Sequence, residues 1–82
     1  MESAMLKPQN VIDTYYLEAR CMILEIAAVF DRYDASVERE GTPAEDARKL
    51  QCLREAMQLT ADPDEHNNRA EKLLQLFANI PT

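Results

Sequence analysis

Three charged residues in the first half of the chain, Glu18, Arg20 and Glu25, have side chains suited to acid–base or ligand-binding chemistry. None of them has an oppositely charged residue three or four positions away, so a helix alone leaves each without a partner. We expect Glu18 or Glu25 to pair with an arginine outside the first helix, with Arg54 as the favoured partner. The functional alternative is a partly buried polar pocket formed by the three charged residues and Tyr16.

Metal binding and catalysis find little support in the same region. Glu18 and Glu25 are seven positions apart, about 10 Å along a helix axis, which is too far for both carboxylates to bind one metal ion. A two-metal carboxylate site would need Glu-x-x-His motifs, and the sequence contains none. His66 is the only histidine, and we expect it to be solvated in the first turn of the third helix, with no nucleophile to activate. We therefore predict no catalytic residue, no metal site and no cofactor.

The remaining reactive residues favour structural roles. Cys21 and Cys52 lack the spacing of a zinc site or a redox motif, so we expect two small core residues that stay reduced and bind no metal. The acidic run from Asp62 to Glu65 lacks the glycine and the distal glutamate of a calcium-binding loop. Gly41 is the only glycine, which excludes a glycine-rich phosphate loop.

Composition limits the classes of function. A chain of 82 residues with 46% hydrophobic and 29% charged residues is typical of one folded domain with a thin core. The net charge of −6, from 9 basic and 15 acidic side chains, opposes binding to nucleic acid. No apolar run is long enough to span a bilayer, and the first residues lack the features of a signal peptide. We expect a cytoplasmic protein that binds neither nucleic acid nor membrane.

The charged candidates lie in a stretch that predicts one long helix over about residues 11–38. Its apolar residues recur every three or four positions and form a broad face. Charged residues run along both flanks of this face, with Glu18, Glu25 and Arg32 on one side and Asp13, Arg20 and Asp31 on the other. The broad face comprises Ile12, Tyr15, Tyr16, Ala19, Met22, Ile23, Ile26, Val29, Phe30, Tyr33 and Val37. A narrow stripe on the opposite side comprises Leu17, Cys21, Leu24 and Ala28.

Two start signals that contain proline predict two further helices. Thr42–Glu45 combines a capping threonine, a proline at the first helical position and a glutamate, and it predicts a helix over about 43–60. Asp62–Glu65 repeats this pattern and predicts a third helix over about 63–79. Asn10 is the predicted cap of the first helix, and Gly41 is predicted to close that helix in the left-handed conformation.

These elements predict an all-α fold: a three-helix bundle-like domain over residues 10–82, with one long central helix followed by an antiparallel helix pair. Residues 1–9 show no periodicity, and we expect a flexible N-terminal arm. The broad face is expected to pack against the helix pair. That arrangement leaves the narrow stripe without a cover from its own chain, and a second copy is the natural cover.

For function, we favour a small non-enzymatic interaction or accessory protein that acts through helical surfaces, forms a homodimer and binds a larger protein partner. The interface residues of this hypothesis are Leu17, Cys21, Leu24 and Ala28. The alternative is a small helical ligand-binding protein or enzyme with a polar pocket near Tyr16, Glu18, Arg20 and Glu25. A cavity at these polar residues favours a ligand, whereas a flat, exposed apolar patch on the narrow stripe favours a protein partner.

Overall fold

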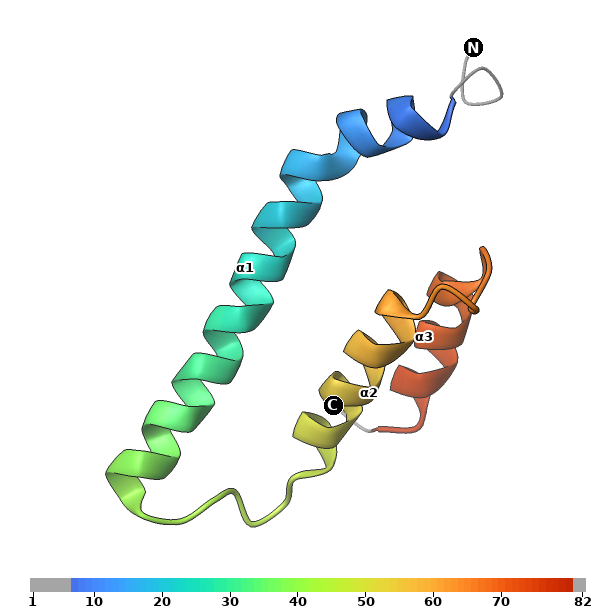
Figure 1. Cartoon of the computed structure of the whole chain (residues 1–82). Coiled ribbons are helices and arrows are strands. Elements are labelled where there is room, and N and C mark those ends of the chain that lie inside the picture. The colour runs from blue at the N-terminus through green and yellow to red at the C-terminus, as the bar shows by residue number, and fades with distance from the viewer. Residues whose placement is uncertain (1–6, 81–82) are drawn as a thin grey trace. The chain divides into compact units, whose positions relative to one another are not determined.

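The computed structural model describes residues 7–80, and its regular secondary structure is entirely helical over that range. Helix α1 spans Pro8–Glu40, α2 spans Arg48–Ala61 and α3 spans Arg69–Ala78, in the order shown in Figure 1. The predicted all-α class, with a long helix followed by a helix pair, is confirmed.

The chain divides into two compact units, Met1–Pro43 and Ala44–Thr82, and we describe each by itself. The first unit contains α1 and the second contains α2 and α3. The predicted single domain, and the predicted packing of the broad face against the helix pair, concern the relation between the two units and stay predictions.

Helix α1 begins earlier than predicted and ends at the predicted glycine. Pro8 occupies the first turn, where its missing N–H costs nothing, and the backbone N–H of Lys7 donates a 3.2 Å hydrogen bond to Asn10 Oδ1. Asn10 therefore lies inside the helix, and its prediction as the cap is wrong. Residues 8 and 9 of the predicted arm are helical, while residues 1–6 lie outside the described range. At the other end Gly41 adopts φ 82° and donates its N–H to Val37 O at 2.7 Å, as predicted.

Helix α2 begins at Arg48, several residues after the predicted start. The carboxylate of Asp46 accepts a 3.0 Å hydrogen bond from the backbone N–H of Arg48 and a 2.7 Å hydrogen bond from its guanidinium. Such bonds between a short acidic side chain and a backbone two residues on compete with helical bonds. The helix start predicted from Thr42–Glu45 is therefore wrong, because the turn at Asp46 sets where the helix begins.

Helix α3 also begins late, at Arg69, for a similar reason. Asp62 Oδ1 accepts a 2.9 Å hydrogen bond from the backbone N–H of Asp64, which folds this stretch into turns. Asn67 has φ 48°, a left-handed conformation that a right-handed helix does not contain. His66 therefore lies in the turns before α3, and its predicted place in the first turn of the helix is wrong.

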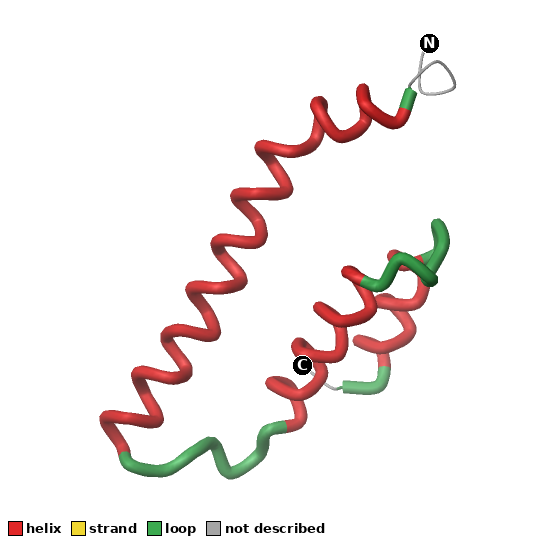
Figure 2. Tube along the Cα trace, viewed as in Figure 1, coloured by secondary structure: helices red, strands yellow, loops and turns green. Residues whose placement is uncertain are grey.

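Helices α2 and α3 run side by side in opposite directions, which Figure 2 shows plainly. The most buried side chains of the described residues are Cys52 and Ala56 on α2, each 6% exposed. Small residues at these positions allow two helices to approach closely. Because α2 packs against α3, these two buried residues mark the seam between the two helices.

Two polar contacts stabilise the loop between α2 and α3. Arg69 Nη2 donates a 2.6 Å hydrogen bond to Asp62 O, and Lys72 pairs with Glu65. Glu65 and Arg69 are four residues apart in the sequence, but Arg69 donates to the backbone at the start of the loop and not to Glu65. The guanidinium Nε of Arg69 is buried and has no hydrogen-bond partner among the described residues.

Candidate functional site

The broad face of α1 carries large apolar side chains that are open to solvent. No described residue of α1 is buried. Ile12, Tyr15, Met22 and Ile23 expose between 51% and 61% of their surface, and Val29 exposes 46%. Ile26, Phe30, Tyr33 and Val37, further along the same face, are half-buried.

The narrow stripe on the opposite side of α1 is exposed as well. Leu17 and Leu24 expose 66% and 55%, Cys21 is exposed and Ala28 is half-buried. These are the four residues of the predicted interface, and their assignment to an interface stays a prediction. Cys21 is not a core residue of this chain, contrary to expectation, whereas Cys52 is; both thiols are free.

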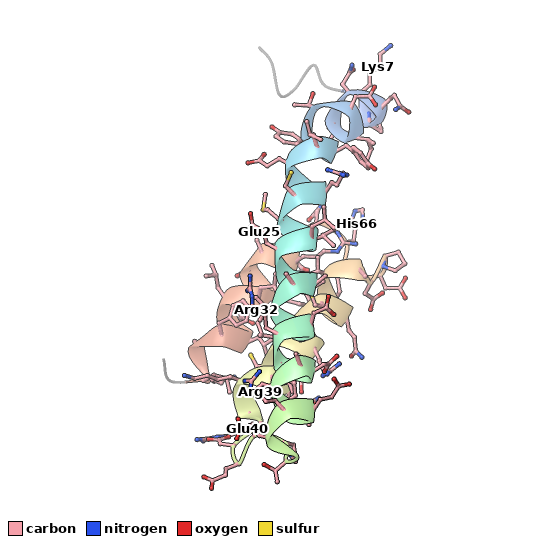
Figure 3. The ribbon with its side chains drawn as sticks, turned by 90° about the vertical axis from the view of Figure 1, so that its left-hand side faces the viewer. Lys7, Glu25, Arg32, Arg39, Glu40 and His66 are labelled. Atoms are coloured by element: carbon pink, nitrogen blue, oxygen red, sulfur yellow. The ribbon has the colours of Figure 1, made fainter. Side chains whose placement is uncertain are left out.

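A charged column runs between the two apolar surfaces of α1. Glu18, Glu25, Arg32 and Arg39 follow one another at intervals of seven residues, which places them on one flank of the helix. Figure 3 shows Glu25, Arg32 and Arg39 in succession along α1. Arg39 lies 3.5 Å from Glu40, but the first three residues make no hydrogen bond or ion pair with any described residue. Arg39 was missed by the sequence reasoning, although its seven-residue spacing from Arg32 was visible.

The four candidates for a polar pocket do not converge on α1 itself. Arg20 lies on the flank opposite to Glu18 and Glu25, and Tyr16 lies at the edge of the broad face beside Arg20, as their helical positions require. A shallow hollow of about 450 Å³ on α1 includes only one of the four, Glu25. The polar pocket, and the pairing of Glu18 or Glu25 with Arg54, stay predictions. The hollow is lined by Leu24, Glu25, Ala28, Val29 and Arg32.

A second hollow, of about 270 Å³, lies between the beginning of α2 and the end of α3. Its lining is apolar except for one lysine, and the sequence reasoning missed it because the pattern of α2 did not show which side meets α3. Apolar hollows of this kind accept apolar side chains. It is lined by Lys49, Cys52, Leu53, Phe77 and Ile80.

Beside this hollow, Asp46 and Arg48 form an exposed ion pair. The hydrogen bonds from the side chain and backbone of Arg48 lower the pKa of Asp46 from 3.8 to about 2. The same contact raises the pKa of the Arg48 guanidinium. Asp46 is therefore a carboxylate that accepts hydrogen bonds at the start of α2, and a poor general base.

Comparisons with known proteins cover the whole chain. No protein-family model, curated protein or solved structure matches it. Between residues 7 and 80, no helix combines the length and apolar character needed to cross a membrane. Over the same residues, no three histidine, cysteine, aspartate or glutamate side chains gather where they could hold a metal ion.

Proposed function

We propose that the chain is a small non-enzymatic interaction protein that uses α1 as its recognition element and associates with a second copy of itself. One observation carries this proposal: α1 exposes large apolar side chains on two opposite sides. A helix on the surface of a small protein normally has one apolar face and one polar face. Exposed apolar patches of this kind mark protein–protein contacts.

Burial of the exposed apolar side chains of α1 favours association. Burying one large apolar side chain stabilises a complex or a fold by roughly 1.5–3 kcal/mol. A domain of this size has a total stability of only about 5–10 kcal/mol. Covering a few of the exposed residues of α1, such as Ile23 at 56% or Leu24 at 55% exposure, therefore adds substantially to the stability of the associated chain.

A cytoplasmic location and a larger protein partner belong to the same proposal. The two free thiols, one of them exposed on α1, are compatible with a reducing compartment. A 33-residue helix with two apolar sides offers one side to a copy and leaves the other for a different protein.

Two neighbouring substitutions test the proposal, with the native mass measured by light scattering from about 1 to 100 µM. Ile23→Glu changes the broad face and Leu24→Glu changes the narrow stripe, and the two native side chains are almost equally exposed, at 56% and 55%. We expect the wild-type chain to be a dimer and one of the two variants to be a monomer. The sequence-based hypothesis assigns that effect to Leu24→Glu.

The two variants also act as controls for each other, because both place a glutamate in the middle of the same helix. A wild-type chain with the mass of one copy at 100 µM contradicts the proposal. So does a dimer whose mass neither substitution changes.

A further inference from the structure

We propose that a second copy of this chain docks on the broad face of α1 in the antiparallel direction, with a twofold axis near residues 27 and 28. The charged column of Glu18, Glu25, Arg32 and Arg39 fixes this direction and register. The inference rests on the self-association proposed above, and it adds the face, the direction and the residues that select the partner.

The order of charges in the column carries the argument. It reads acid, acid, base, base, with seven residues between neighbours. In an antiparallel pair of helices related by a twofold axis, each flank meets the same flank of the other copy. Glu25 then lies opposite Arg32 of the second copy, and Glu18 lies opposite Arg39 of the second copy. Each pair occurs twice, so four acids meet four bases.

The apolar residues of the broad face agree with the same register. Residues whose numbers sum to about 55 lie at the same height in the two copies, which aligns apolar with apolar along most of the seam and sets Tyr15 opposite Glu40 at each end. The aligned pairs are Ile26 with Val29, Met22 with Tyr33, Ile23 with Phe30, and Tyr16 with Val37.

Other registers on the broad face place like charges together. A slip of one heptad in one direction sets Glu25 opposite Glu25 of the second copy. A slip in the other direction sets Arg32 opposite Arg32 of the second copy. A parallel pair brings the column against the apolar flank that contains Ile23 and Phe30. In that arrangement the charged residues of the column have no oppositely charged partner on the second copy. The antiparallel register proposed here is the one in which each of the four charges of the column lies opposite a residue of opposite charge on the second copy.

The narrow stripe fits a copy less well, although the same column also flanks it. The register that pairs the charges there brings Asp31 of one copy against Ala28 of the other and places Glu38 against Cys21. Burying unpaired carboxylates in an apolar seam is costly. The charges therefore favour the broad face, in contrast to the two sequence-based hypotheses that the narrow stripe meets the copy and that the broad face packs against the helix pair.

The described contacts leave the central charges available for this role. Glu25 and Arg32 are exposed and make no hydrogen bond or ion pair with a described residue. They line a shallow hollow together with Val29 of the broad face and with Leu24 and Ala28 of the narrow stripe. Figure 3 shows both side chains on α1.

Charge reversals on the full chain test the inference, with the dissociation constant of the dimer measured by sedimentation equilibrium at low salt. Glu25→Arg alone, and Arg32→Glu alone, each turn two attractive contacts into two repulsive ones. We expect each single variant to dissociate roughly tenfold more readily than wild type. The double variant with both changes restores the pairs in swapped form, and so does an equimolar mixture of the two single variants. Both should dimerise within about threefold of wild type, and salt should narrow the differences.

Glu38→Arg is the matched control, because it makes the same charge change on an exposed part of α1 away from the broad face. We expect it to leave the dissociation constant unchanged. Single variants that dimerise as wild type does, or a double variant and a mixture that stay as weak as the single variants, overturn the inference. In either case a wild-type dimer still supports self-association, whereas a wild-type monomer overturns both proposals.

Discussion

Helix α1 and the α2–α3 pair show two different ways in which a helix meets its environment. The pair contains fewer helical residues, but it buries Cys52 and Ala56 in its own seam. Helix α1 is 33 residues long and buries no described residue. A helix gains most of its stability in proteins from packing an apolar face. The pair therefore supplies part of its own stability, whereas α1 depends on what covers it.

The largest effect is expected in the seam of the pair. Ala56→Leu adds three carbons where the native side chain is 6% exposed, so the helices must move apart. We expect a loss of about 1–3 kcal/mol in the free energy of unfolding, measured by urea denaturation with circular dichroism. The control is Ala70→Leu on an exposed position of α3, with an expected change within about 0.5 kcal/mol. Equal effects of the two substitutions would show that the pair has no packed seam.

A smaller effect is expected where α1 ends. Gly41 has φ 82°, and a Cβ added there meets nothing within 4 Å, so Gly41→Ala carries only the cost of backbone strain. We expect about 1 kcal/mol of destabilisation, with faster amide hydrogen exchange in the last turn of α1. Asn67→Gly is the comparison, because Asn67 has φ 48° and glycine relieves its strain. If Gly41→Ala lowers the free energy of unfolding no more than Asn67→Gly does, the left-handed conformation at the end of α1 does not require glycine.

The smallest effect concerns the start of α2. Because the folded pKa of Asp46 is about 2, below its ordinary value of 3.8, the charged form favours the folded state. Its contribution is present above about pH 4 and is lost as the pH falls through 2. We expect an NMR titration of the Asp46 carboxyl group to give a midpoint near 2, and Arg48→Gln to move it towards 3.8. If the midpoint is unchanged in Arg48→Gln, the ion pair with Arg48 is not the cause of the lowered pKa of Asp46.

The sequence predicted the helices through their periodicity but misplaced all three of their starts, those of α2 and α3 by more residues than that of α1. Gly41 was predictable because the left-handed conformation at a helix end favours glycine, which has no side chain. Thr42–Glu45 and Asp62–Glu65 also match helix starts, yet Asp46 and Asp62 form local turns that a pattern of residue types does not distinguish from caps.

The candidate surfaces were predictable to a similar degree. Spacing alone gave the two apolar sides of α1, because a helix fixes where each residue points. In the pair, Cys52 was predicted as a core residue, whereas Ala56 was missed because it is small and gives a weak apolar signal. Arg39 was missed because the apolar stripe thins before it, although the charge pattern continues.

The two cysteines have a consequence for following the molecule in solution. Cys21 is exposed on α1, whereas Cys52 is 6% exposed in the seam between α2 and α3. A thiol reagent therefore meets Cys21 directly and reaches Cys52 only when the pair opens. With two native cysteines in the whole chain, the time course of alkylation separates into two steps. The slow step reports how often the pair opens, and the rate of the fast step reports how often the side of α1 that carries Cys21 is uncovered.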